Sequence, residues 1–114
     1  GDRAAGSGRM VLEIMKAGGV IVAGTDTPNA INLHGELMAY TMAGMTAFDA
    51  LKAATVNPAK VLGYDGGTIE PGKLADLIAI DGDPLANIAS TYKVKKVVAN
   101  GRAYDVAELV ARKQ

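Results

Sequence analysis

The 114-residue sequence has no cysteine and no tryptophan, and it has only one histidine and one phenylalanine. Without cysteine the chain can form neither disulfides nor thiolate metal sites. A catalytic zinc ion usually takes about three protein ligands, most of them histidine or cysteine. Because His34 is the single histidine, the chain cannot build such a site alone.

Other absences bear on partners and location. Lys plus Arg equals Asp plus Glu at 12 each, so we expect neither a nucleic-acid nor a membrane partner. No apolar run approaches the roughly 20 residues that cross a bilayer. The lack of cysteine is compatible with a cytoplasmic location, which we expect. Residues 1–8 lack an initiator Met and a signal-peptide pattern, so we expect a cut end or the middle of a longer chain.

The first half of the chain predicts helices around one buried strand. Apolar residues recur at helical spacing over residues 10–17, and two glycines follow. Residues 20–23 (VIVA) are apolar without polar alternation, which predicts a strand buried on both faces, as in a parallel sheet. A second helix is expected from about Leu33 to Ala43.

A third helix is predicted to open at Thr46, where Thr46 and Asp49 resemble a capping box, and to run to about Val56. We expect Asn57-Pro58 to break it, because the residue before a proline avoids the helical region. A short turn of helix ending at Gly63 should follow.

At Asp65 the pattern changes, and we place a boundary there between two domains, residues 1–64 and 65–114. The second domain is predicted to hold strands at 76–81, 94–99 and 102–105 and a terminal helix from 106. Its turns carry the expected residues: Pro71-Gly72 suits a type II turn, and Asn100-Gly101 suits a type I′ hairpin.

Asp26 is the main candidate for a metal-binding or catalytic role. It follows the predicted strand at 20–23, and active sites of α/β barrels lie at the carboxyl ends of their strands. A carboxylate at that rim can bind a divalent metal or accept a proton from a metal-bound water. The spacing leaves a second interpretation open, in which Asp26 caps the following loop by bonding a backbone N–H near Pro28.

Three consecutive motifs resemble those of the amidohydrolase superfamily. They are VIVAGTDTP at 20–28 with LHGEL at 33–37, the stretch at 43–63, and the stretch at 67–77. The similarity covers about residues 10–104 and is closest to the imidazolonepropionase-like and prolidase-like branch. It implies an α/β fold: the last βα unit of a (β/α)₈ barrel of the TIM type, plus part of a small C-terminal β-sandwich.

The resemblance also implies a function. In that family the aspartate after the last barrel strand binds the catalytic metal and acts as general base, and Asp26 stands at the matching position. The implied reaction is metal-dependent hydrolysis of carbon–nitrogen bonds in small-molecule amides, cyclic amides or peptide-like substrates, with zinc as the expected metal.

The family's other metal ligands, a His-x-His pair, a lysine or glutamate and two further histidines, have no counterpart here. We therefore expect a fragment that is inactive alone, binds no zinc stably, and associates with the rest of its barrel or with itself because its strand edges would be exposed. The alternative is a non-catalytic, β-rich interaction module derived from such a tail.

Other polar residues have structural interpretations beside functional ones. His34 could contact substrate or support the metal site, but we favour a role in bonding the loop before its helix. Aspartates near predicted strand ends are expected to be turn residues, and a lysine cluster is expected to be a solvated strand edge. These are Asp76, Asp81 and Asp83, and Lys93, Lys95 and Lys96.

Overall fold

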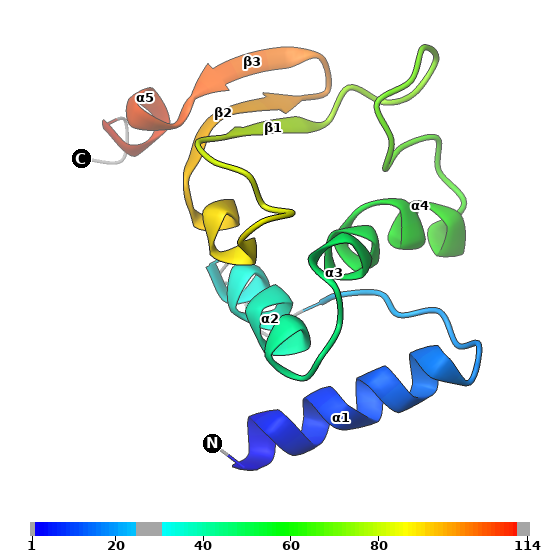
Figure 1. The fold of residues 1–114 in the computed structure, drawn as a ribbon. Coiled ribbons are helices and arrows are strands. Elements are labelled where there is room, and N and C mark those ends of the chain that lie inside the picture. The colour runs from blue at the N-terminus through cyan, green and yellow to red at the C-terminus, as the bar shows by residue number, and fades with distance from the viewer. Residues whose placement is uncertain (1, 25–30, 112–114) are drawn as a thin grey trace.

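The computed structural model describes residues 2–24 and 31–111, with only the backbone described for residues 2–8. Helices come first and a small sheet follows. Their order is α1 (Asp2–Lys16), α2 (Ile31–Met42), α3 (Ala47–Ala54), α4 (Val56–Leu62), β1 (Leu77–Ile80), the 3-10 helix η1 (Ile88–Tyr92), β2 (Val94–Ala99), β3 (Arg102–Asp105) and α5 (Val106–Ala111). The sheet lies above α1–α4, α5 lies beside β3, and η1 lies between the sheet and α2 (Figure 1). Within this part of the chain, every helix falls short of the length and apolar character that a membrane crossing requires.

The start of α3 follows the predicted capping. Thr46 is extended (φ −68°, ψ 152°), and its Oγ1 accepts a hydrogen bond of 3.1 Å from the N–H of Asp49. This bond satisfies one of the N–H groups that the first helical turn leaves without a partner. Gly63, the predicted end of the next helix, has the left-handed conformation (φ 76°) that glycine commonly adopts there.

The break between α3 and α4 lies two residues earlier than predicted. It falls at Thr55 (φ −127°, ψ −85°), whereas Asn57 and Pro58 lie inside the first turn of α4. Proline is tolerated there because the first N–H groups of a helix have no partner within the helix. Gly67 (φ +83°) packs against this break so closely that a Cβ would lie 2.7 Å from the carbonyl oxygen of Thr55. Only glycine fits at that position.

The strand predicted at residues 20–23 is wrong for this structure, because residues 19–24 form no strand. A strand needs a neighbouring strand to pair its N–H and C=O groups, and in the described part of the chain helices take that place. The N–H of Ala23 donates to the carbonyl of Ala53 at 2.8 Å, and Asn57 Nδ2 donates to the carbonyl of Ile21 at 2.9 Å.

The three strands have the predicted positions and form an antiparallel sheet in the order β1-β2-β3. The turn between β2 and β3 has positive φ at both central residues, Asn100 (50°) and Gly101 (81°), as the type I′ turn requires. Because β2 is the central strand, the prediction that Lys95 and Lys96 mark a sheet edge is wrong. Both are exposed nonetheless, and Lys96 lies 3.8 Å from Asp105 on β3.

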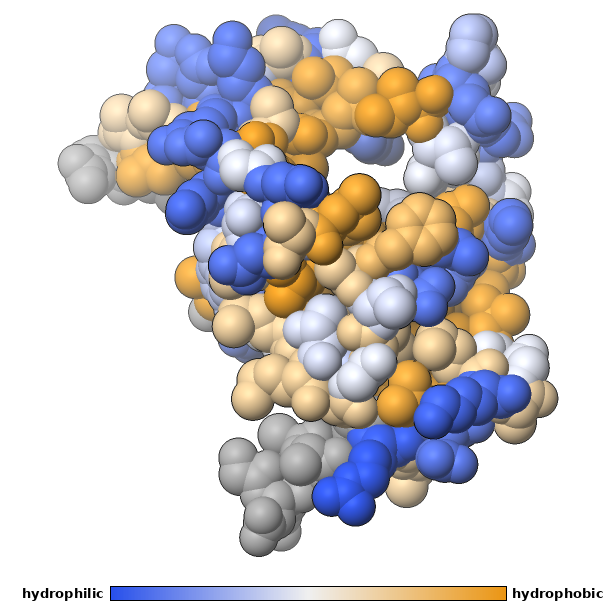
Figure 2. Space-filling model, in the orientation of Figure 1, coloured by the Kyte–Doolittle hydropathy of each residue, from blue (hydrophilic) through white to orange (hydrophobic). Residues whose placement is uncertain are grey.

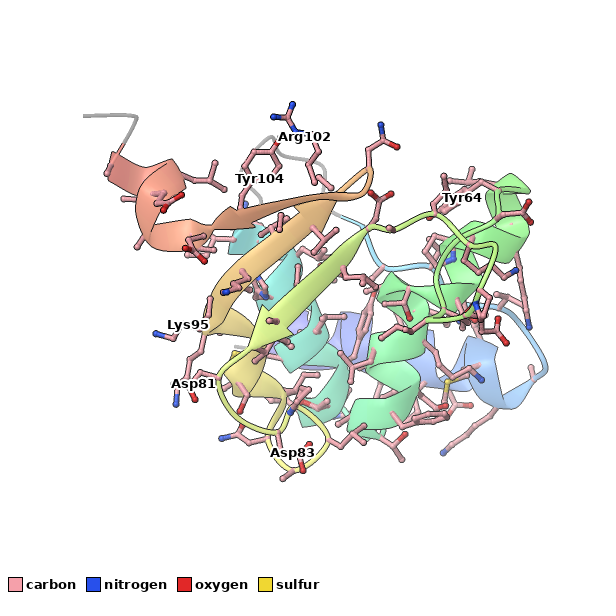
Figure 3. The ribbon with its side chains drawn as sticks, turned by 90° about the horizontal axis from the view of Figure 1, so that it is seen from above. Tyr64, Asp81, Asp83, Lys95, Arg102 and Tyr104 are labelled. Atoms are coloured by element: carbon pink, nitrogen blue, oxygen red, sulfur yellow. The ribbon has the colours of Figure 1, made fainter. Side chains whose placement is uncertain are left out.

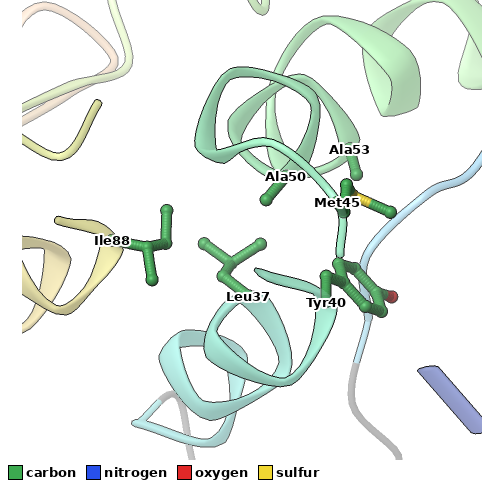
Figure 4. Close-up of a cluster of buried hydrophobic side chains, with 6 residues drawn as sticks. All are labelled: Leu37, Tyr40, Met45, Ala50, Ala53 and Ile88. Carbon is green, nitrogen blue, oxygen red and sulfur yellow. The ribbon is translucent and has the colours of Figure 1, made fainter. Parts of the chain in front are cut away.

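The buried core belongs mainly to α2 and α3. It contains Leu37, Tyr40, Met45, Ala50, Ala53 and Ile88 (Figure 4). Only Ile88, from η1, comes from the second half of the chain, and no residue of the three strands is buried. The sheet therefore has no buried layer of its own.

The chain exposes more surface than a compact protein of its size. Its accessible area is 8012 Å² and its radius of gyration is 15.0 Å. A compact monomer of 11.7 kDa exposes about 5,900 Å², and 114 residues pack to a radius of about 13 Å. The apolar surface is visible as orange atoms over the sheet and around the helices (Figure 2).

Candidate functional site

Asp26, the predicted metal ligand and general base, lies outside the described residues. The structure describes the chain that leads to it, residues 19–24, and the helix α2 that begins at Ile31. The candidate site is therefore known through these two flanking segments and through the elements that hold them.

The segment before Asp26 is held by the junction of α3 and α4. Besides the two hydrogen bonds from Ala23 and Asn57, the side chains of Ile21 and Ala23 pack against the buried cluster. Val20 and Val22 are exposed, so the side chains of residues 20–23 alternate between core and solvent. This alternation is the one expected of an extended chain with one covered face.

The segment after Asp26 is held through His34, near the start of α2. Its Nδ1 lies 3.0 Å from Oγ1 of Thr91 and shares a hydrogen bond with it. The imidazole also lies 4.9 Å from the ring of Tyr92, at an angle of 38°. Thr91 is buried, at 2% exposure. This bond joins α2 to η1, 57 residues further along the chain. The loop before α2 lies outside the described residues, so the expected bond from His34 to that loop stays a prediction.

Tyr40 and Glu36 form a polar pair one turn further along α2. Burial and the neighbouring carboxylate, with which the hydroxyl is hydrogen-bonded, raise the pKa of Tyr40 from its ordinary value of 10.0 to about 12. The hydroxyl of Tyr40 thus donates to the carboxylate of Glu36 from a buried position.

Asp83 has the expected role of a turn residue, whereas Asp76 lies in no turn and instead bonds the β2–β3 turn 24 residues away. Oδ1 of Asp76 accepts from the N–H of Asn100 at 2.7 Å, and Oδ1 of Asp83 accepts from the N–H of Leu85 at 3.0 Å. Asp81 follows β1 and is exposed. Asp81 and Lys95 lie at one end of the sheet, and Asp83 lies on the loop beyond them (Figure 3). None of these carboxylates is close to His34 in a metal-binding group.

The described residues do not fit a complete zinc site. Among residues 2–24 and 31–111, no three histidine or acidic side chains come close enough to hold a metal ion. The only imidazole has one of its nitrogens bonded to Thr91. Asp26, the residue that the sequence analysis predicted as a metal ligand, lies outside the described residues.

Two hollows that share lining residues lie between the α3–α4 junction and the second half of the chain. The larger, about 550 Å³, is apolar and is lined by residues that include Phe48, Leu51 and Leu85. The smaller, about 280 Å³, reaches Leu77 and Ile78 of β1. Thr55, Gly67 and Thr68 line both. Because the walls are mainly apolar, these hollows suit apolar side chains better than a charged ligand.

Sequence reasoning missed two contact residues at this site. Asn57 was interpreted only as a helix breaker, and no role was expected for Thr91. Asn57 lies within the second motif, at 43–63, which was the available signal. No sequence pattern indicated a role for Thr91. The residues of η1 show no apolar repeat at helical spacing, and the burial of Thr91 depends on the packing of η1 against α2.

The chain belongs to the amidohydrolase family, whose family model matches residues 2–104. It is similar to a 5-methylthioadenosine/S-adenosylhomocysteine deaminase of Thermoanaerobacter pseudethanolicus, with 33% identity over 81% of this chain and 27% of the relative. It is also similar to an ochratoxinase of Aspergillus niger, with 37% identity over 73% of this chain and 18% of that protein.

Solved structures agree with these sequence matches. A Xaa-Pro dipeptidase with methionine bound in its active site superposes with a TM-score of 0.77 and 32% identity. That match covers 89% of this chain and 25% of the dipeptidase. The chain thus spans no more than about a quarter of the length of these relatives.

Proposed function

We propose that this chain is the part of a metal-dependent amidohydrolase that supplies Asp26 to the catalytic centre. The observation that carries the proposal is the family match, which spans residues 2–104 and therefore includes Asp26. The described flanks support it, since α3, α4 and η1 hold the chain before and after this residue through long-range hydrogen bonds.

The proposed reaction is hydrolysis of a carbon–nitrogen bond in a small-molecule amide, cyclic amide or peptide-like compound. The named relatives, a deaminase and a dipeptidase, are consistent with this class of substrate. Asp26 would bind the metal, which we take to be zinc, and accept the proton of the attacking water. A bound zinc ion lowers the pKa of water and polarises the substrate carbonyl.

We propose that the remaining ligands come from polypeptide other than residues 1–114, a proposal supported by the presence of only one histidine and no cysteine in this sequence. We propose that residues 1–64 complete a barrel as its last βα unit. In that setting residues 20–23 would gain the neighbouring strands that they lack here. Residues 65–114 would form part of a small β-sandwich.

The exposed surface supports the expectation that the chain associates. Its accessible area exceeds that of a compact monomer by roughly 2,000 Å², and a stable interface covers about 800 Å² on each partner. The partner that we propose is the rest of the barrel, with self-association as the substitute when the barrel is absent. A compact monomer in sedimentation velocity at micromolar concentration would contradict this.

The experiment compares the 114-residue chain with the full-length gene product. Metal content is measured by mass spectrometry, and hydrolysis is measured on dipeptides and cyclic amides. We expect metal and activity only when the upstream barrel is present. Asp26→Asn should abolish activity and lower metal content, whereas Asp81→Asn, at an exposed loop position, should change neither. Stoichiometric zinc in the isolated chain would refute the proposal.

A stand-alone β-rich interaction module is the weaker candidate. Such a module needs a buried core within the sheet region, but Ile88 is its only contribution to the buried cluster. Cooperative unfolding of residues 65–114 as a separate polypeptide would favour this alternative.

A further inference from the structure

The two edges of the sheet differ in charge. The order β1-β2-β3 makes β1 and β3 the outer strands. β1 has the sequence LIAI, without a charged residue or a proline, whereas β3 has the sequence RAYD, with a charge at each end. The carboxylate of Asp105 on β3 lies 3.8 Å from Lys96. Proteins commonly protect an edge strand from further pairing with charge or proline, so β3 is protected in this way and β1 is not.

The backbone of β1 has pairing groups on its outer side. The N–H of Asp81 donates to the carbonyl of Lys93, and the carbonyl of Ala75 accepts from the turn between β2 and β3. Because successive residues of a strand direct their N–H and C=O groups to opposite sides, the odd-numbered positions of β1 face β2. Ile78 and Ile80 therefore direct theirs outwards. In the described part of the chain, these two residues make no backbone hydrogen bond outside the sheet.

Exposed apolar side chains surround this edge. Ile78 is 53% exposed, and Ile69, which lines the smaller hollow with it, is 85% exposed. Ala79 is also exposed. The edge thus combines apolar surface with backbone donors and acceptors, which are the features that the addition of a β-strand uses. The occupant that fits is an extended strand with apolar side chains and no charge.

A second copy of β1 meets these requirements. Antiparallel pairing about a twofold axis at Ala79 places Ile78 of one copy opposite Ile80 of the other. These residues then exchange N–H···O=C bonds, and their side chains meet on one face of the sheet. An axis at Ile78 would instead place the carboxylate of Asp76 opposite Ile80. The axis at Ala79 is therefore the better fit.

The exposed surface is large enough for such a dimer. The chain exposes roughly 2,000 Å² more than a compact monomer, whereas a stable dimer covers about 800 Å² on each copy. Pairing through β3 is less favourable, because it would partly remove the charges of Arg102 and Asp105 from water. The contrast between the edges thus selects β1.

We propose that the 114-residue chain by itself forms a dimer through its β1 strands, with Ala79 of the two copies facing each other at the twofold axis. The inference rests on the self-association included in the proposed function, and it names the surface that carries it. Because a twofold contact is closed, the assembly ends at the dimer.

The first experiment introduces one cysteine into the chain, which has none. The two copies of Ala79 form a pair without mutual hydrogen bonds, with about 4.5 Å between their Cα atoms, and disulfides span such a distance. In oxidised glutathione, Ala79→Cys should form a disulfide-linked dimer at least about tenfold faster than Ala103→Cys. Non-reducing gel electrophoresis measures both rates. Ala103 is the matched control, because it is an equally small, exposed residue on the other outer strand.

Ile78→Lys tests the same edge without cysteine chemistry. A lysine on an edge strand opposes the addition of another strand. Sedimentation velocity should show a dimer dissociation constant at least about tenfold higher, because the added charge would lie unpaired in the interface. The far-ultraviolet circular dichroism should stay that of the parent, since Ile78 is exposed. Ala103→Lys is the control and should leave the dissociation constant within about twofold.

The outcomes separate this inference from the proposed function. A dimer that persists unchanged in Ile78→Lys, or cysteines that cross-link equally fast at positions 79 and 103, would overturn the β1 interface and leave self-association standing. Assemblies larger than a dimer would overturn it as well. A parent chain that stays a compact monomer at micromolar concentration would contradict self-association itself. None of these results alters the metal and activity measurements on the full-length gene product.

Discussion

The helical region, residues 2–62, and the sheet region, residues 77–105, are built differently. Five of the six core residues lie in the first region, where small side chains such as Ala50 and Ala53 let α2 and α3 approach closely. The sheet has the hydrogen bonds and register of a regular antiparallel structure, yet none of its strand residues is buried. Backbone pairing sets the register of a sheet, but burial of its side chains must come from a second layer.

The difference predicts where substitutions matter. In the helical region side chains contribute through burial and backbone fit, so changes there should alter the free energy of unfolding. In the sheet region the exposed side chains contribute little to the free energy of unfolding of this chain. Changes there should therefore alter association instead.

Leu37→Ala should have the largest effect. Leu37 is 4% exposed and lies between Ile88 and Ala50 in the core (Figure 4). Its truncation removes buried surface and leaves a cavity, which should lower the free energy of unfolding by roughly 3–4 kcal/mol. Urea unfolding followed by circular dichroism measures this. A loss below about 1 kcal/mol would show that the helical region has no more of a core than the sheet.

Gly67→Ala should follow. The added Cβ would overlap the backbone at Thr55 in a left-handed conformation, which should cost roughly 2–3 kcal/mol. Gly72 is the matched control, because it is also left-handed (φ +86°) but no atom lies within 4 Å of its added Cβ. Gly72→Ala should cost only about 1 kcal/mol, from backbone strain. Equal losses in thermal unfolding would contradict the close packing of Gly67.

Thr46→Ala tests a local contribution within the helical region. It removes the acceptor for the N–H of Asp49 and should destabilise the protein by about 1 kcal/mol. Thr46→Ser keeps the oxygen and should retain most of that stability. The comparison is made by urea unfolding, and a serine variant as unstable as the alanine variant would argue against capping.

Ile78→Thr should have the smallest effect on unfolding. Ile78 is 53% exposed on β1, so its substitution should change the free energy of unfolding by less than about 0.5 kcal/mol. Sedimentation velocity should nevertheless show weaker association, because the exposed apolar side chain, which lines the smaller hollow, is available to a partner. A large loss of stability without a change in association would reverse the contrast between the two regions.

Local patterns predicted much of the fold. The Asn100-Gly101 turn fixed the β2–β3 hairpin, and Thr46 fixed the start of α3, since each depends on a few adjacent residues. The strand at 20–23 was mispredicted because its apolar sequence specifies burial, whereas strand formation requires a neighbour. The prediction for Asp26 stays a prediction, because Asp26 lies outside the described residues.

The residues that hold the two segments beside Asp26 could not be predicted from the sequence, because their contacts join distant parts of the chain. The hydrogen bonds from Asn57 to Ile21 and between His34 and Thr91 can form only after the helices have packed. The family motifs indicated which segments matter, but not which side chain bonds which. The domain boundary at Asp65 likewise stays a prediction, and Ile88 crosses it to reach the core.

The large accessible area has a consequence for calorimetry. Two quantities grow with the surface that unfolding newly exposes: the heat capacity change of unfolding, and the slope with which denaturant lowers the free energy of unfolding. A chain that already exposes 8012 Å² when folded has less left to expose. Its transitions should be broader than those of a compact domain of equal length, and they should sharpen once a partner covers the sheet.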